Sequence, residues 1–148
     1  MSVHIRGFHH VGVAVADLDA TLAWYRKVFG VEPDSIERIA NDVQSTMAEL
    51  EDVELRLAFV TVGGARIGLS EYASPRGDAY TLRTCDVGAF HTCLQVDDLR
   101  QTYADMLELG VEFAAPPAEV AQGAWYTYFR DCNGLQFELV QLPATEAA

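Results

Sequence analysis

Two segments of the chain resemble each other, and this duplication constrains the fold more than any other feature. Residues 8–18 read Phe-His-His-Val-Gly-Val-Ala-Val-Ala-Asp-Leu, and residues 89–99 read Ala-Phe-His-Thr-Cys-Leu-Gln-Val-Asp-Asp-Leu. His10 matches His91, and valine, aspartate and leucine recur at further matching positions. Repetition of this kind indicates a duplicated supersecondary unit. We therefore expect two similar halves, each with a buried strand that carries a histidine, followed by a capped helix.

The first copy begins with an alternation that predicts a strand over residues 9–16. Its valines occupy every second position and are expected to face the core. His10 then lies on the opposite face, beside small residues that leave room for a ligand or a metal. Asp17 is the expected N-cap of a helix over residues 18–29, which Gly30 would end in a left-handed conformation.

Beyond the strand that carries the histidine, the chain predicts three further strands in each half. The first half has a strand within 31–39, a loose polar segment over 41–46, and strands 53–62 and 66–72 joined by a Gly63-Gly64 turn. The second half has strand 90–96, helix 99–109, strand 111–114, and strands 125–130 and 135–142 around an Asp-Cys-Asn-Gly turn. Each half is thus expected to be β-α-β-β-β.

These elements predict an α+β fold made of two paired βαβββ modules. We place the modules at residues 5–72 and 88–143, with residues 73–87 as the connection. With helices outside, the other faces of the two curved sheets are expected to form a cup-shaped, incompletely closed mixed sheet.

Charge and composition exclude several classes of partner. The net charge is −12, from 10 basic and 22 acidic residues, so we expect no nucleic-acid partner. No long apolar run and no secretory signal pattern is present, which predicts a cytoplasmic protein without a membrane partner. The 3 cysteines fit neither a disulfide framework nor a zinc cluster. A neutral or weakly charged small molecule is the expected partner.

Three residues form a candidate metal site. The repeat puts His10 and His91 at equivalent positions, and Glu138 lies in the apolar run Leu-Gln-Phe-Glu-Leu-Val. A single strand histidine is usually a packed core residue, and a single strand glutamate usually faces solvent. The duplication favours metal binding instead, because two imidazoles and one carboxylate are common ligands of divalent metals. His4 and His9 have no such support and are expected to be exposed.

Several motifs support a resemblance to a known family. They are the duplicated module, the strand histidine followed by Val-Ala-Asp-Leu or Val-Asp-Asp-Leu, the run Trp-Tyr-Arg-Lys-Val-Phe-Gly at residues 24–30, and the segment 128–138. Together they resemble the vicinal oxygen chelate superfamily, which includes lactoylglutathione lyase, methylmalonyl-CoA epimerase, fosfomycin-resistance proteins and type I extradiol dioxygenases. The resemblance covers about residues 5–143. It implies a cup around a divalent metal, with His10, His91 and Glu138 as ligands.

The chain also departs from the pattern of that family. The lyase and epimerase branches have a fourth ligand, Glu or Gln, at the place held here by Gly68, which has no side chain to bind a metal. Glu71 lies three positions after Gly68, so its side chain is expected on the opposite face of the strand and would need a bulge to reach the cup. The carboxylate base of the epimerase would fall near Arg56, within an expected cup-facing set of Glu54, Arg56 and Ala58.

Two histidines and one carboxylate leave open positions on Fe(II) for substrate and dioxygen. The leading hypothesis is therefore an Fe(II)-dependent dioxygenase acting on a phenolic or quinonoid aromatic with adjacent oxygens. Tyr128 would be the acid or hydrogen-bond donor, or a wall residue, and Tyr126 or Trp125 could orient the ring. The dioxygenase signature also has a histidine shortly before its tyrosine, and no histidine follows His91 here.

Two other functions remain open. One is a metal-dependent isomerase or lyase of the epimerase or glyoxalase kind, with water or Glu71 completing the metal shell. The other is a metal-independent, drug-binding resistance protein, although Gly12 stands where the fosfomycin-resistance proteins have threonine. Mn, Co, Ni and Zn are alternatives to Fe(II). We expect a homodimer, with the cup formed either within one chain or by exchange of modules between two.

Overall fold

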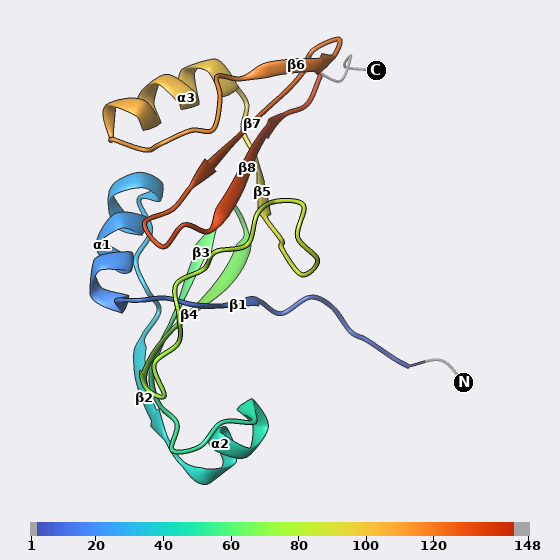
Figure 1. Cartoon of the computed structure of the whole chain (residues 1–148). Helices are drawn as coiled ribbons and strands as arrows, with labels where there is room; N and C mark the ends of the chain where they lie inside the picture. The colour runs from blue at the N-terminus through green and yellow to red at the C-terminus, as the bar shows by residue number, and fades with distance from the viewer. Residues whose placement is uncertain (1–2, 144–148) are drawn as a thin grey trace. The chain divides into compact units, whose positions relative to one another are not determined.

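The computed structural model describes residues 3–143 and contains two four-stranded mixed sheets (Figure 1). The strand orders are β1-β4-β3-β2 and β5-β8-β7-β6. The chain divides into two compact units. The first comprises the residues before Trp24 together with Val31–Gly77, and the second comprises Trp24–Gly30 and the residues from Asp78 onward. The predicted α+β class, with one mixed sheet for each copy of the repeat, is confirmed.

The first sheet is built from β1, β2, β3 and β4. The elements of this part of the chain are β1 (Val11–Ala14), α1 (Leu18–Phe29), β2 (Ile36–Ala40), α2 (Asp42–Ala48), β3 (Glu54–Val62) and β4 (Ala65–Ser74). β1 pairs with β4 in parallel, and the other pairs are antiparallel. The expected turn between β3 and β4 is present, with φ of 55° at Gly63 and 84° at Gly64. Two positive φ values are what a two-residue hairpin turn of type I′ requires.

The segment expected to be a loose polar stretch forms the short helix α2. Asn41 caps it by accepting a hydrogen bond from the Gln44 backbone N–H at 2.8 Å, and Glu49 ends it in the left-handed conformation with φ of 55°. No residue of α2 is buried. At 7 residues, the helix is also shorter than the window of about 11–18 residues over which apolar periodicity indicates a helix.

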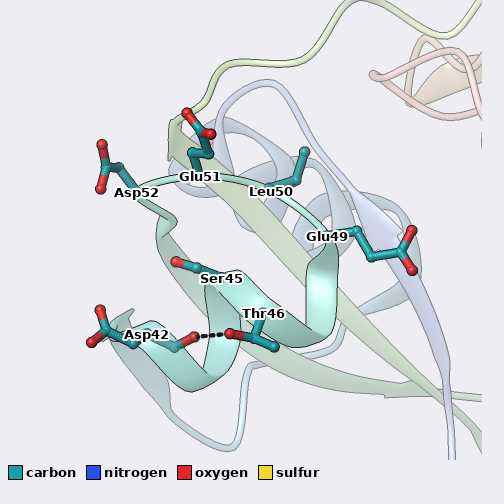
Figure 2. A pocket seen from close by; sticks show the side chains of 7 residues that line it. All are labelled: Asp42, Ser45, Thr46, Glu49, Leu50, Glu51 and Asp52. Carbon is teal, nitrogen blue, oxygen red and sulfur yellow. Dashed lines mark hydrogen bonds between the residues drawn. The ribbon is translucent and has the colours of Figure 1, made fainter.

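A hollow of about 440 Å³ lies between α2 and the turn that follows it, lined by Asp42, Ser45, Thr46, Glu49, Leu50, Glu51 and Asp52. Figure 2 shows the Thr46 hydroxyl bonded to the Asp42 carbonyl, at 2.8 Å, while the side chains of Asp42 and Glu49 point in opposite directions. The acidic side chains diverge and do not surround a common point. None of the residues predicted to form the site lines this hollow.

The second sheet repeats this plan. Its unit contains β5 (Thr92–Gln95), α3 (Leu99–Glu108), β6 (Ala118–Ala121), β7 (Ala124–Arg130) and β8 (Gln136–Gln141). The predicted strand 111–114 is reduced to an isolated bridge between Phe113 and Phe129, and β6 pairs with β7 further along. Two prolines separate these segments, and proline cannot donate a ladder hydrogen bond. The outer strand is therefore split.

Each unit has its own apolar core. In the first unit, Leu18 on α1 and Val60, Ile67 and Leu69 on the sheet are fully buried. In the second unit, Phe129 and Phe137 stack with ring centroids 5.2 Å apart, and Tyr25 from the last turns of α1 contacts Phe137. The end of α1 thus packs within the second unit. The module limits 5–72 and 88–143 remain a prediction.

The three helices between residues 3 and 143 are too short or too polar to span a lipid bilayer.

Candidate metal centre

His91 and Glu138 lie side by side in the second unit. Glu138 is in the middle of β8 and is directly paired with Cys93 on β5, two residues after His91. His91 Nε2 lies 2.9 Å from Glu138 Oε2, with the histidine side chain 38% exposed and the glutamate side chain 18% exposed. The parallel pairing of β5 and β8 therefore brings together two of the three predicted ligands.

Tyr128 completes the polar group on this face of the sheet. It pairs with Glu138 across β7 and β8, and its ring lies edge-on to the His91 ring at 5.5 Å. Desolvation, followed by the negative charge of Glu138, raises the pKa of the Tyr128 hydroxyl. The same two causes raise the pKa of the Cys93 thiol. Both groups therefore keep their protons beside the carboxylate.

The first unit presents His10, Phe59 and Gly68 in a matching arrangement. Gly68 pairs with Phe59 on β3 and with Gly12 on β1, two residues after His10. The His10 ring lies edge-on to Phe59 at 5.1 Å. A Cβ atom at Gly68 would meet the Phe59 ring at 2.9 Å and the His10 ring at 3.4 Å. Gly68 therefore faces His10, as Glu138 faces His91.

The hydrogen bonds that begin the two helices support this equivalence. Glu71, three residues after Gly68, accepts a bond from the Leu18 backbone N–H at the start of α1. Gln141, three residues after Glu138, accepts the corresponding bond from Leu99 at the start of α3. Gly68 and Glu138 are thus equivalent positions of the two units. Glu71 lies on the helix-bearing face, so it does not reach the face that carries His10.

The expected cup-facing set Glu54, Arg56 and Ala58 is wrong by one residue. Arg56 points to α1, where it bonds Asp19 at 2.7 Å, and it also bonds Glu71 of β4 at 3.3 Å. Because side chains alternate along a strand, Phe59 lies on the opposite face from Arg56, together with Gly68 and His10. The pairing register between β3 and β4 decides the face, and the apolar alternation of the sequence is ambiguous here. On the face that carries His10, β3 therefore presents Phe59 and has no carboxylate that could act as the base.

Trp125 also lies away from Tyr128. It is an odd number of positions from Tyr128 on β7, and the Arg100 guanidinium of α3 covers its ring at 4.2 Å. Tyr126 shares the Tyr128 face, with ring centroids 5.6 Å apart. Of these aromatic residues, Tyr126 and Tyr128 are the ones placed to contact a ligand beside Glu138.

Arg66 and His9 belong to the same surroundings as His10, and the sequence reasoning missed both. Arg66 precedes Gly68 by two positions on β4, so it shares its face. The guanidinium lies 3.9 Å from the centre of the Phe59 ring and 3.2 Å from His9 Nε2. His9 in turn contacts His10 through the two Nδ1 atoms, at 2.7 Å. The sequence contained a signal for Arg66, because a residue two positions before Gly68 on the same strand is expected to lie on the same face.

The three predicted ligands are divided between the units, with His10 in the first and His91 and Glu138 in the second. Over residues 3–143 the structure contains no cluster of three or more histidine, cysteine, aspartate or glutamate side chains that could hold a metal. A hollow of about 340 Å³ lies beside Tyr128, lined by Thr84, Glu112, Phe113, Ala114, Tyr128, Phe129, Arg130 and Gln136. Its mixed lining suits the organic part of a small ligand.

Comparison with known proteins shows a matching family model and two related epimerases. The model of the Glyoxalase/Bleomycin resistance protein/Dioxygenase superfamily matches residues 7–139. The chain is 28% identical to a 2-epi-5-epi-valiolone epimerase from Actinomyces sp. over 92% of its length and 79% of the relative's. It is 26% identical to the mitochondrial methylmalonyl-CoA epimerase of Bos taurus, over 90% of its length and 73% of the relative's.

Solved structures share the fold. A glyoxalase family protein from Bacillus cereus superposes with a TM-score of 0.84 at 16% identity, covering 96% of this chain and 97% of that one. The fosfomycin resistance protein FosX from Listeria monocytogenes, solved with Mn(II) and sulfate, superposes with a TM-score of 0.64 at 22% identity, covering 95% and 96%. Both have the architecture seen here.

Proposed function

Because the chain belongs to the glyoxalase/bleomycin resistance protein/dioxygenase superfamily, the vicinal oxygen chelate group that its motifs resemble, we propose that it is a metal-dependent isomerase. More specifically, we propose an epimerase that inverts a carbon centre next to a carbonyl group of a small molecule. The relatives named as epimerases support this isomerase alternative better than the Fe(II) oxygenase. The observation that carries the proposal is the His91–Glu138 pair on the face that also presents Tyr128.

The chemistry of this pair fits a divalent metal. Bonds of about 2.1 Å at right angles place neighbouring ligand atoms about 3 Å apart, and His91 Nε2 and Glu138 Oε2 lie 2.9 Å apart. We propose His10 as the third ligand, because it has the same register relation to Gly68 that His91 has to Glu138. This donor set accommodates Fe(II), Mn, Co, Ni or Zn.

A bound divalent ion would supply Lewis-acid polarisation of a substrate carbonyl, which acidifies the hydrogen on the adjacent carbon. Because β3 offers no carboxylate on this face, a water molecule is proposed to take that proton and to return one to the opposite face of the carbon. Tyr128 is proposed to donate a hydrogen bond from its hydroxyl to a substrate oxygen, since a tyrosine is protonated at neutral pH. The His91 ring packs edge-on against the Tyr128 ring. The hollow beside Tyr128 is proposed to receive the organic part of the substrate.

The test is hydrogen exchange in deuterated water. Protein loaded anaerobically with one divalent metal at a time is incubated with methylmalonyl-CoA or with 2-epi-5-epi-valiolone, and deuterium is followed by mass spectrometry. We expect deuterium to enter at least one substrate without oxygen. Tyr128→Phe should slow the exchange about tenfold or more, whereas Tyr126→Phe, the matched control, should slow it less.

An Fe(II) oxygenase is a second candidate, because one observation favours it. Gly68 supplies no ligand at the place equivalent to Glu138, which would leave a metal more positions for substrate and dioxygen. Oxygen uptake coupled to the loss of a catechol or hydroquinone chromophore, with no deuterium exchange in any thioester or ketone, would contradict the isomerase and support the oxygenase.

A further inference from the structure

Arg66 puts a positive charge next to His10. Its strand neighbour Ile67 pairs with Val11 in the parallel register of β1 and β4, so Arg66 lies beside His10 at the edge of the ladder. The guanidinium stacks on the Phe59 ring at 3.9 Å, and the same ring packs against His10. The side chain is 34% exposed. The cation is therefore held flat on an aromatic surface within reach of ligands.

The surroundings of Arg66 provide little compensation for its charge. Arg66 forms an ion pair with Asp34 at 3.6 Å, beyond hydrogen-bond distance, and because the Asp34 side chain is 64% exposed, solvent screens this pair and makes it weak. The next residue on its face of β4, Gly68, has no side chain where the second unit has Glu138. Acidic residues outnumber basic ones by 22 to 10 in the chain, so the overall composition does not explain why a positive charge lies on this face.

The guanidinium also keeps donors available. Its Nη1 atom lies 3.2 Å from His9 Nε2, and within residues 3–143 the Arg66 side chain makes no other hydrogen bond. An arginine has five N–H donors in a planar fork that matches the oxygens of a carboxylate or phosphate. Stacking on Phe59 and contact with His9 hold the fork in place, so little side-chain entropy is lost when an anion binds.

We infer that Arg66, held by Phe59 and His9, is a binding subsite for an oxyanionic group of the substrate, next to His10. The substrate would then be a small molecule with a carboxylate or phosphoryl group in addition to the oxygens near the metal. This inference rests on the proposed function in one respect, namely that the bound anion is part of a substrate. Binding of an anion at Arg66 itself requires no metal. An anionic group of this kind would differ from the neutral or weakly charged partner that the sequence predicts, and that expectation stays a prediction.

The test measures anion binding without metal. The chain, labelled with ¹⁵N and treated with EDTA, is titrated at low salt with inorganic phosphate and, separately, with acetate, and the Arg66 Nε–Hε resonance is followed by NMR. We expect a saturable shift at millimolar concentrations. Arg66→Gln should weaken phosphate binding about tenfold or more, because hydrogen bonds to charged groups are among the strong ones. Arg38→Gln on β2 removes the same charge from an exposed position and should leave binding unchanged.

Two outcomes would overturn the subsite. One is a shift at Arg66 that rises linearly without saturation and matches the shift of Arg38. The other is equal phosphate affinity in Arg66→Gln and the unaltered chain. If Arg66→Gln does not fold, Arg66→Lys serves, because it keeps the charge but lacks the fork, and binding should weaken. Failure of the epimerase assay would leave these results unaffected, since they involve neither metal nor turnover.

Discussion

Asp131 shows how one buried carboxylate holds a turn and an aromatic core together. Its side chain accepts hydrogen bonds from the backbone N–H groups of Asn133 at 2.8 Å and Leu135 at 2.9 Å, both at Oδ1. The Tyr25 hydroxyl donates to the other oxygen at 3.3 Å. Burial raises the pKa of Asp131, although these hydrogen bonds lower it in part. The turn is thus fixed by a group that is costly to ionise.

This cost makes a prediction about pH. A carboxyl group with a raised pKa in the folded state binds its proton more tightly than in the unfolded state. Its contribution to stability is therefore present below the unfolded pKa of about 4 and is lost as the pH rises through the folded pKa. Asp131→Asn keeps an oxygen for the two backbone donors and removes the ionisation. Relative to the unaltered chain, the variant should be more stable at neutral pH than in mild acid, as measured by urea unfolding.

Two controls check the assignment. Asp131→Ala leaves the donors without a partner and should cost about 1–3 kcal/mol at either pH. Asp86→Asn should show the opposite pH trend, because hydrogen bonds from Arg83 lower the pKa of Asp86. A stability difference between Asp131→Asn and the unaltered chain that does not change with pH would contradict the raised pKa.

At the scale of elements, β4 separates the structural and the ligand-facing roles of the first unit. Ile67, Leu69 and Glu71 point to the helix-bearing face, where the first two are buried and the third holds the start of α1. Arg66 and Gly68 point to the face that carries His10. β8 has the same division, with Gln141 bonded to the start of α3 and Glu138 beside His91. The alternation of side chains along each strand thus directs one set of residues to the helix and the other set to the face that carries the histidine.

This equivalence predicts that a ligand can be restored at Gly68. Because a Cβ there would lie 2.9 Å from the Phe59 ring, Gly68→Glu is combined with Phe59→Ala to make room. The double variant should bind Zn(II) about tenfold more tightly than Phe59→Ala alone, since another carboxylate joins the ligands. Competition with a chromogenic chelator measures the affinity. Equal affinity in the two variants would show that position 68 is not directed at the metal.

At the scale of the whole chain, the duplication places one histidine directly before the first strand of each unit, whereas the equivalent strand position holds a carboxylate, Glu138, in the second unit and Gly68 in the first. The proposed ligand set therefore draws on both units. The family that the model shows and the relatives named as epimerases support an enzyme, and the metal remains part of the proposed function. The homodimer and the cytoplasmic location expected from the sequence remain predictions.

If both units supply ligands, losing either histidine should weaken metal binding. We expect His10→Ala and His91→Ala each to lower Zn(II) affinity at least about tenfold, since even residues outside the ligand set cost that much. His4→Ala, in the exposed segment before β1, is the matched control and should leave the affinity unchanged. Titration calorimetry provides the measurement. Full affinity in His10→Ala would restrict the site to the second unit.

Local sequence patterns were sufficient for much of the fold. The repeat predicted two similar units, caps and apolar spacing predicted α1 and α3, and Gly63-Gly64 predicted the hairpin between β3 and β4. Such signals act over a few residues, so they can be read without knowing what packs where. Strand parity also predicted that Glu71 would lie on the face opposite Gly68, because alternation is a property of the strand itself.

Only the tertiary structure decided which faces meet and what covers them. The side on which Arg56 lies depends on the register between β3 and β4, and its bonds to Asp19 and Glu71 join strand and helix positions far apart in the sequence. The stacking of Arg66 on Phe59 depends on the same strand pairing, and the bond from Tyr25 to Asp131 joins residues 106 positions apart. A sequence determines local periodicity directly, whereas these contacts exist only after strands have paired and helices have packed.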